Sequence, residues 1–218
     1  DYGTDAVIAT GHEAAAHGEA VTSLVLIPSL VDVLEIPVIA AGGFADGRGL
    51  AAALALGAEG IAMGTRFMTT KDSPLHENFK RLSIEKGVTD TLYSKRVDGI
   101  CCRVLKTEAA ERAVRNGLDW LAAFSNSRDI AAQLHLPYAK LFLGVLASGW
   151  KNAVQLAYMA NGFKAFKRAT EDGDLEKGIL PVGQVTGLVH DEPAVREVIE
   201  RMVAEANRVS GKLSGQLV

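Results

Sequence analysis

Two pairs of residues at the ends of predicted strands have the chemistry of a phosphate site. Each pair follows a short apolar run, 36–41 in one case and 60–63 in the other. Glycine lets the backbone turn and approach a ligand because it has no side chain. Amides freed at such strand ends, near the start of a helix, suit phosphate oxygens. Glycines also end strands in many α/β proteins, but two such ends on consecutive strands favour a phosphate clamp. The four residues are Gly42, Gly43, Gly64 and Thr65.

His17 is the candidate for acid–base chemistry. It follows the first predicted strand, 6–9, among small residues that leave access to it. Active sites of parallel barrels lie at the carboxyl edge of the strands, and a histidine there can exchange a proton near neutral pH. The alternative is a surface-loop histidine held by Glu13 or Glu19. The residues His12, Glu13 and His17 lack the regular helical spacing of a zinc pair, so we expect no metal site.

Composition excludes several classes of protein. The 218 residues carry a net charge of -3 without a basic block, which argues against nucleic acid as the main partner. No run approaches the roughly 18 apolar residues of a membrane span, and no signal peptide opens the sequence. The adjacent Cys101 and Cys102 make no disulfide framework and have no neighbouring histidine motif. We therefore expect a cytoplasmic protein, away from membranes, whose cysteines are not nucleophiles.

The order of elements predicts an α/β fold. Strand 6–9, a helix over 24–34, strand 36–41, a helix capped by Asp46 and strand 60–63 alternate as in a TIM-type (β/α)8 barrel. Such a barrel typically takes about 250 residues, so we expect only its C-terminal strands here, together with a helix-rich second domain. The predicted domains are 1–70 for the barrel part, 71–178 for a helix-rich substrate or lid domain, and 179–218 for a return segment with a C-terminal helix on the barrel.

The region after Thr69 mixes helices with one β-prone stretch. We predict a helix from Ser73 to Lys86 with Pro74 in its first turn. Residues 91–105 are β-prone around an Asp98–Gly99 turn. Further helices are predicted at 108–116, 129–134, 151–170 and 191–210.

Four segments together resemble the nitronate monooxygenase family, the flavin enzymes once called 2-nitropropane dioxygenases. They read DAVIATGHEAAAHGE (5–19), IPVIAAGGFADGRGLAAALALGA (36–58), GIAMGTRF (60–67) and GQVTGLVHDEP (183–193). The match is strong through 5–70 and looser between 71 and 178. The two glycine-containing segments are specific to this flavin superfamily but not to one reaction.

The resemblance implies a cofactor and a reaction. It implies FMN, with its phosphate on the amides of the four strand-end residues, and His17 as the catalytic histidine facing flavin and substrate. It also implies flavin contacts from Ala16 and Gln184. The implied reaction oxidises an alkyl nitronate with O2, through electron transfer by the flavin, to a carbonyl compound and nitrite.

The sequence departs from the family pattern in two ways. Members often have glycines where this sequence has Ala15 and Ala16, and Asp or Gln where it has Thr10. Both changes put the specific reaction in doubt more than the cofactor.

Two alternatives stay open beside a nitronate oxygenase. One is an NAD(P)H-dependent flavin reductase of quinones or enoyl thioesters on the same scaffold, which needs no dinucleotide fingerprint. The other is a non-catalytic fragment or subunit that completes a barrel with a partner. The sequence does not fix the oligomeric state, and a homodimer is compatible with it.

Overall fold

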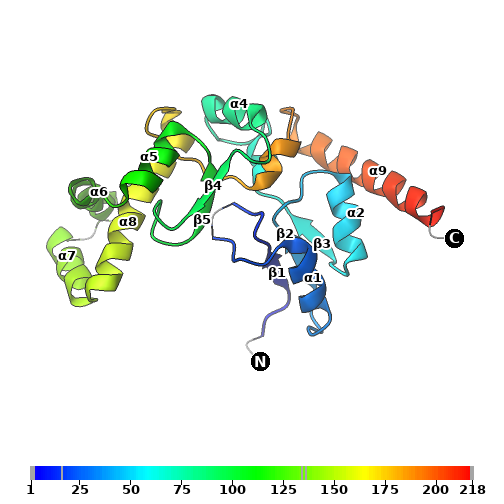
Figure 1. Cartoon of the computed structure of the whole chain (residues 1–218), viewed down its shortest axis with the longest axis horizontal. Coiled ribbons are helices and arrows are strands. Elements are labelled where there is room, and N and C mark those ends of the chain that lie inside the picture. Colours follow the sequence, from blue (N-terminus) through cyan, green and yellow to red (C-terminus); the bar gives the residue numbers. More distant parts are fainter. Residues whose placement is uncertain (1–2, 16, 134, 136, 217–218) are drawn as a thin grey trace.

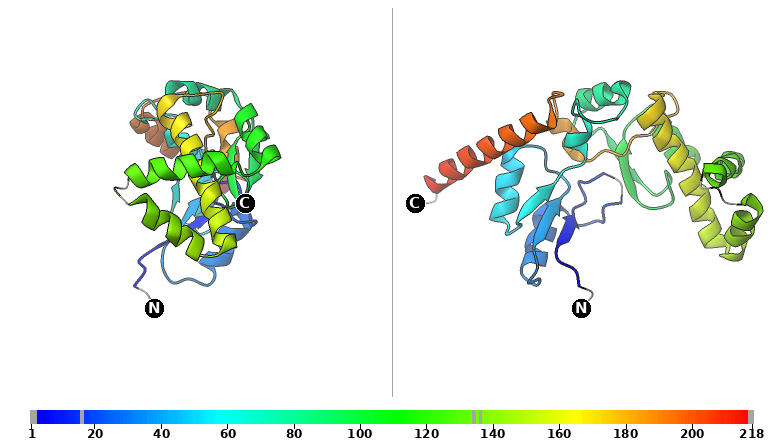
Figure 2. Two further views of the ribbon diagram at one scale, coloured as in Figure 1. Left: turned by 90° about the vertical axis from the view of Figure 1, so that its left-hand side faces the viewer. Right: turned by 180° about the vertical axis from the view of Figure 1, so that it is seen from behind.

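The structure is a computed structural model that describes residues 3–15, 17–133, 135 and 137–216. A small parallel sheet and its helices form one part of the molecule, and a β-hairpin lies beside it (Figure 1). Three helices, α6 to α8, form one end of the long axis, and the C-terminal helix α9 extends at the other end (Figures 1 and 2).

The parallel sheet has the order β1-β2-β3, formed by Val7–Thr10, Val38–Ala41 and Gly60–Ala62. Thr10 pairs with Ala41 and Ala41 pairs with Ala62, so the three strands end in register. The prediction that the two strand-end pairs, Gly42–Gly43 and Gly64–Thr65, lie at one edge of a parallel sheet is confirmed. The strands are too few to show a closed barrel, so the structure itself establishes an α/β fold only.

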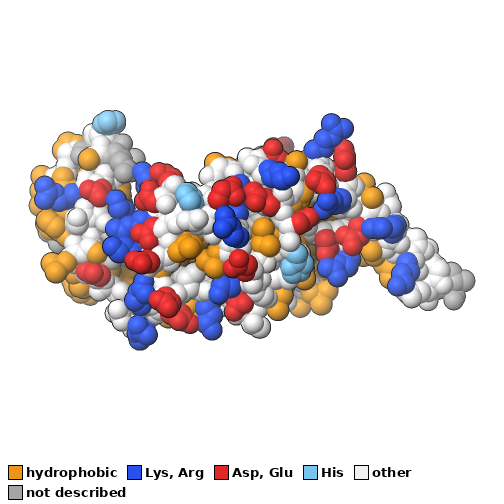
Figure 3. Space-filling model, turned by 90° about the horizontal axis from the view of Figure 1, so that it is seen from above, with side chains coloured by type: hydrophobic (Ala, Val, Ile, Leu, Met, Phe, Trp, Pro, Cys, Tyr) orange, Lys and Arg blue, Asp and Glu red, His pale blue; other side chains and the backbone are white. Residues whose placement is uncertain are grey.

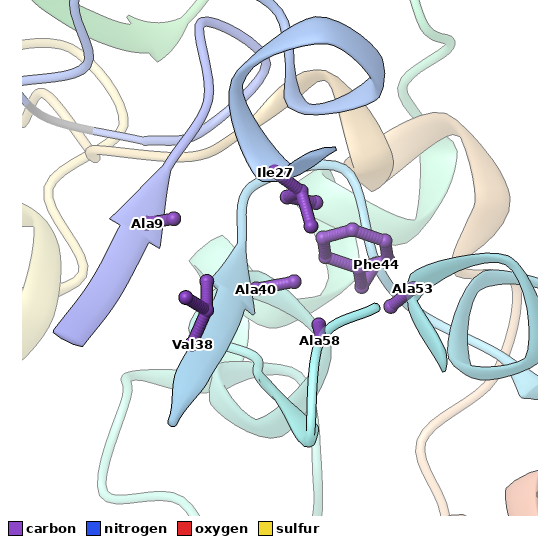
Figure 4. Close-up of a cluster of buried hydrophobic side chains, with 7 residues drawn as sticks. All are labelled: Ala9, Ile27, Val38, Ala40, Phe44, Ala53 and Ala58. Carbon is purple, nitrogen blue, oxygen red and sulfur yellow. The ribbon is translucent and has the colours of Figure 1, made fainter. Parts of the chain in front are cut away.

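Helices α1 (Ser23–Val31) and α2 (Gly47–Ala55) pack on this sheet. The Asp46 carboxylate accepts hydrogen bonds from the amides of Arg48 and Gly49 at 3.0 and 3.1 Å, which confirms the predicted cap. The ring of Phe44 lies between the side chain of Ile27 and Ala53 (Figure 4). The buried cluster consists of Ala9, Ile27, Val38, Ala40, Phe44, Ala53 and Ala58.

The first strand is less buried than its apolar sequence predicts. Ala9 is 3% exposed, but Ile8 is 62% exposed. Alternate residues of a strand face opposite sides, so only one face of β1 is covered. Leu24 and Val25 of α1 are also exposed, so the surface near β1 and α1 is partly apolar.

The predicted β-prone stretch forms an antiparallel hairpin, β4 (Thr91–Ser94) and β5 (Cys102–Leu105). The predicted helix from Ser73 is wrong at its start, because α4 spans Glu77–Glu85. The imidazole of His76 accepts a hydrogen bond from the Asn78 amide and caps α4, and the ψ of His76, 136°, lies outside the helical region. Side-chain capping therefore sets this boundary, and Pro74 lies outside the helix.

The next helices are α5 (Glu108–Asn116), α6 (Trp120–Gln133), α7 (Tyr138–Ala147) and α8 (Trp150–Lys167), and a π-helical turn (Arg168–Asp172) continues α8. Helix α6 begins nine residues before the predicted start at 129, and α7 was not predicted. Aromatic contacts join these helices: Trp120 stacks on Trp150 with ring centroids 5.4 Å apart, and Phe124 meets Tyr138 edge-on. Tertiary packing of this kind overrides a weak helical pattern.

The last part of the chain returns to the sheet region through a 3-10 turn, Gln184–Leu188, to α9 (Val195–Ser214). The Glu205 carboxylate accepts a hydrogen bond from the Gly47 amide at 2.8 Å, which ties α9 to the start of α2. The domain boundaries at 70 and 178 stay predictions. None of the described helices is long and apolar enough to cross a membrane.

Candidate functional site

A cavity of about 300 Å³ lies where the parallel strands end. It brings together all four predicted phosphate residues, Gly42, Gly43, Gly64 and Thr65. Its other lining residues are Ala14, Ala15, Ala41, Phe44, Ala62, Met63, Gly183 and Val185. None of the described lining residues carries a carboxylate. Glu13 packs behind Gly43, and its carboxylate accepts hydrogen bonds from the amide and hydroxyl of Ser23.

The glycines at the end of β2 are required by the backbone. Gly42 and Gly43 have φ of +90° and +84°, a region that side chains disfavour. A Cβ on Gly42 would also lie 3.0 Å from the carbonyl oxygen of Gly11. The same Cβ would lie 3.1 Å from Ala14 Cβ, so this turn packs closely against the loop that precedes His17.

Gly64 differs from these two glycines. Its φ of -89° and ψ of -67° are open to any residue, and a Cβ built there meets no atom within 4 Å. Because Gly64 lines the cavity, that space belongs to the cavity itself. Glycine at this position therefore keeps room for a ligand rather than permitting a turn.

Thr65 begins a single helical turn, α3 (Thr65–Met68). The hydroxyl of Thr65, which is 5% exposed as a residue, accepts a hydrogen bond from the Gly183 amide at 3.0 Å. The hydroxyl thus fastens the C-terminal segment over the cavity. The amide of Thr65 has no acceptor within its own helical turn, as at any helix start.

The two remaining predicted flavin contacts are placed differently. Ala16 lies outside the described residues. Gln184 does not line the cavity, but its backbone amide donates to the carbonyl oxygen of Glu13 at 2.9 Å, and its neighbours Gly183 and Val185 do line it. The segment around Gln184 is therefore part of the site wall.

His17 forms a close pair with Asp98 of the hairpin turn. Its Nε2 lies 2.7 Å from Asp98 Oδ2, and the two side chains are 47% and 8% exposed. The other carboxylate oxygen of Asp98 accepts a hydrogen bond from the Ile100 amide at 3.2 Å. A buried, anchored carboxylate orients the ring and leaves Nδ1 without a hydrogen-bond partner among the described residues. His17 does not itself line the cavity, although Ala14 and Ala15 of its loop do.

Neither of the two acidic residues expected as alternative partners, Glu13 and Glu19, holds His17 in the structure, although His17 does lie in an exposed loop. Glu13 accepts hydrogen bonds from the amide and hydroxyl of Ser23, at 3.0 and 3.1 Å. The carbonyl oxygen of Glu19 lies 2.9 Å from His12 Nδ1 instead. The sequence predicts Asp98 only as a turn residue, because no local signal links it to a histidine 81 residues away.

The hairpin also holds the loop that carries His17. Arg103 donates from its guanidinium to the carbonyl oxygen of His12, at 3.0 Å from Nη2, and Tyr93 donates its hydroxyl to the carbonyl oxygen of Gly18. Burial, together with the nearby Cys101, raises the pKa of the Tyr93 phenol, which keeps it a donor. The two ends of the loop are thus fixed from one side, which positions His17 at the sheet edge.

Other chemically active side chains have structural roles. Arg66 is 6% exposed and its Nη2 pairs with Asp191 Oδ1 at 2.8 Å, as expected for a residue directed away from Thr65. Burial, with the Asp98 carboxylate nearby, raises the pKa of the Cys102 thiol to about 12. No cluster of His, Cys, Asp and Glu with metal-ligand geometry occurs in the described part of the chain.

A second, apolar cavity of about 230 Å³ lies between α6, α7 and α8. Trp120, Phe124 and Trp150 line it, so these aromatic residues form a pocket wall. They are 47%, 49% and 75% exposed, respectively, unlike the side chains of a closed core.

The sequence matches the family description "Nitronate monooxygenase" over residues 1–205. The chain belongs to the nitronate monooxygenase family. Members of this family are flavin-dependent oxidoreductases, which agrees with the resemblance drawn from the four sequence segments.

The relatives and solved structures that this chain resembles carry names for different reactions. A Rhodococcus jostii protein named (3aS,4S,5R,7aS)-5-hydroxy-7a-methyl-1-oxo-octahydro-1H-indene-4-carboxyl-CoA dehydrogenase is 39% identical over 94% of this chain and 60% of its own length. FabK from Thermotoga maritima superposes with a TM-score of 0.72 at 33% identity, over 98% of this chain and 58% of that one. A nitroalkane oxidase from Streptomyces ansochromogenes does so with a TM-score of 0.68 at 25% identity, over 97% and 54%. The chain thus spans about three fifths of these relatives.

Proposed function

We propose that this chain forms the FMN-phosphate and acid–base part of a flavin-dependent oxidoreductase. The observation that carries the proposal is the convergence of Gly42, Gly43, Gly64 and Thr65 on one cavity at the carboxyl edge of the strands. The loop that forms another wall of this cavity leads directly to the His17–Asp98 pair.

The residues at the cavity fit a flavin phosphate. Glycines line it, its described lining residues carry no carboxylate, and Gly64 leaves space that a side chain would occupy. Amides at strand ends and at the start of a helical turn stabilise a bound anion by charge-assisted hydrogen bonds. A dianionic phosphate monoester is therefore a better ligand for this cavity than a neutral group.

The three parallel strands also fit part of a (β/α)8 barrel. The outer face of β1 exposes Ile8, and the relatives are longer than this chain. In such barrels the phosphate site forms from loops after the last two strands. This supports assigning β2 and β3 to that position.

The chain itself provides the proton chemistry in this proposal. When bound, the flavin supplies electron transfer. The Asp98 carboxylate holds the Nε2 side of the His17 ring, so Nδ1 is the nitrogen directed to a substrate. His17 there polarises a substrate oxygen or removes a proton beside it.

Two substrate classes follow from different observations. The family description favours an alkyl nitronate, oxidised with O2 to a carbonyl compound and nitrite. The similarity over 94% of this chain to a carboxyl-CoA dehydrogenase favours a CoA thioester, dehydrogenated beside its carbonyl. His17 can serve both substrates. It can polarise the oxygen of a nitronate, which carries a negative charge, and it can remove a proton beside the carbonyl of a thioester.

The first experiment is the visible spectrum of the purified protein, with identification of the chromophore released by heat. Released FMN supports the proposal, whereas a colourless protein that FMN cannot reconstitute contradicts it and supports the non-catalytic alternative. Nitrite formation with O2 uptake then identifies a nitronate oxygenase. Flavin bleaching without air by a CoA thioester identifies a dehydrogenase, and bleaching by NAD(P)H identifies a reductase.

A further inference from the structure

A basic groove lies in the helical part of the molecule, apart from the strand-end cavity. It has a volume of about 300 Å³ between α5, α6, α8 and the turn that follows β4. Five of its lining side chains are basic and one, Asp119, is acidic. The basic residues are Arg96, Arg112, Lys164, Arg168 and Lys177.

This concentration of positive charge is unusual for the protein as a whole. The whole sequence has 23 basic and 26 acidic residues, and on the face shown in Figure 3 Lys and Arg side chains are interspersed with Asp and Glu. Asp119 is already engaged, because its carboxylate accepts a hydrogen bond from the Ala122 amide at 2.9 Å. The groove therefore favours a ligand with several negative charges.

Internal acidic partners in the described part of the chain pair with only two of these five cations. Among the described residues, Arg96, Arg168 and Lys177 form no ion pair, and the Arg96 guanidinium donates to the carbonyl oxygen of Val114 at 3.0 Å. Lys164 is paired with Asp129 at 3.4 Å, and Arg112 lies 3.5 Å from Glu108. Three of the five basic groups thus remain for an anion.

The remaining wall of the groove suits a flat, uncharged ring. Tyr158, Val97 and Ile179 line it beside small alanine side chains. An aromatic ring beside cationic side chains is the combination that binds a nucleoside with phosphates, since the base stacks on the ring and the phosphates meet the cations.

The groove and His17 share one structural element. Arg96 and Val97 line the groove, and Asp98, the next residue, binds His17. Helix α8 abuts this turn, since a Cβ on Gly162 would lie 2.6 Å from Asp98 Cβ. A ligand with a phosphorylated nucleoside at one end and its reactive group at the other, joined by a flexible arm, can reach both places.

We propose that this groove binds the adenosine 3′,5′-bisphosphate end of a coenzyme A thioester. The inference deepens, and rests on, the thioester form of the proposed function. A phosphorylated nicotinamide dinucleotide offers similar chemistry, with an adenosine that carries its ribose phosphate on the 2′ oxygen. The position of that phosphate distinguishes the two sources.

The test is calorimetric titration of the full chain with adenosine 3′,5′-bisphosphate, at one fixed salt concentration because phosphate contacts are salt-dependent. We expect saturable binding that is tighter than for adenosine 2′,5′-bisphosphate. The double variant Arg168→Gln, Lys177→Gln removes two unpaired cations and should weaken binding about tenfold or more. Absence of saturable binding, or equal or tighter binding of the 2′,5′ isomer, would overturn the proposal.

A matched control separates a local contact from a general charge effect. Arg208 and Lys212 are exposed on α9 and do not line the groove, so Arg208→Gln, Lys212→Gln changes the net charge equally. This pair should shift the affinity by less than about twofold, since distant surface charges are screened. An equal loss of nucleotide affinity in both double variants would overturn the proposal of a specific site. If the groove pair fails to fold, the exposed Lys177→Gln alone is titrated against Lys212→Gln.

Flavin content measured on the same samples separates this inference from the proposed function. Nucleotide binding needs no flavin, so a flavin-free protein that still binds the 3′,5′ isomer contradicts the oxidoreductase and not the groove. A flavin-containing protein that does not bind the nucleotide contradicts only the proposal for the groove.

Discussion

Replacing Gly64 by valine tests the phosphate cavity without disturbing the backbone. The φ and ψ of this residue lie in the right-handed helical region, and a Cβ there has no neighbour within 4 Å. The valine side chain therefore enters the cavity of about 300 Å³ rather than the protein core. Replacing a glycine at an unstrained site changes stability by about 1 kcal/mol or less.

The expected loss concerns flavin affinity. A hydrogen bond to a charged group contributes about 1.5–3 kcal/mol. Displacing the phosphate from two amides, such as those of Gly64 and Thr65, should cost about 3–6 kcal/mol, or roughly 10²–10⁴-fold in the FMN dissociation constant. Reconstitution of apoprotein with FMN, followed by fluorescence quenching, measures this directly, and thermal unfolding of the apoprotein reports stability.

A valine at Gly60 is the matched control. Gly60 begins β3, outside the cavity, and a Cβ there meets Ile39 Cδ1 at an ordinary 3.7 Å. Gly60→Val should keep FMN affinity. If Gly64→Val binds FMN within about threefold of the unaltered protein, the phosphate does not lie in this cavity. Gly43→Val is a poorer test, because its φ of +84° strains any side chain and its Cβ faces Glu13.

Three further predictions concern the histidine pair, the cysteines and an ion pair. His17→Ala should lower turnover by roughly 10²–10⁴-fold while flavin content stays constant. Asp98→Asn should lower turnover less, because the His17 ring keeps a hydrogen-bond acceptor. If His17→Ala loses flavin together with activity, His17 has a structural role instead. A thiol reagent at pH 8 should label the exposed Cys101 quickly and the buried Cys102 only after unfolding. The Cys102 pKa of about 12 leaves on the order of one thiolate in ten thousand at that pH. Rapid labelling of both cysteines would contradict the burial of Cys102. Burial alone would raise the pKa of Asp191, but donation from Arg201 and the charge of Arg66 outweigh it and hold the pKa below its usual 3.8. This ion pair therefore stabilises the fold above pH 3.8 and is lost as the pH falls below it. The melting temperature of Asp191→Asn should approach that of the unaltered protein only in that acidic range. A difference in melting temperature that stays constant from pH 7 to 3 would contradict this.

Local sequence determined the parts of the protein that depend on neighbouring residues. Paired glycines marked where β2 ends, since only glycine adopts the positive φ seen at Gly42 and Gly43. The Asp46 carboxylate marked the start of α2 because it bonds amides two and three residues away. The alternation of apolar runs and helical patterns predicted three parallel strands, and their carboxyl ends bring the four predicted phosphate residues to one edge.

Only the tertiary structure decided the partners that are distant in sequence. Asp98 reaches His17 across 81 residues, and the Thr65 hydroxyl holds Gly183 across 118. Periodicity and turn residues say nothing about such pairs, because the packing of the hairpin and the return segment on the sheet brings them together. The basic groove has the same origin, since its cations come from separate helices and turns and become one site only when α5 and α8 pack.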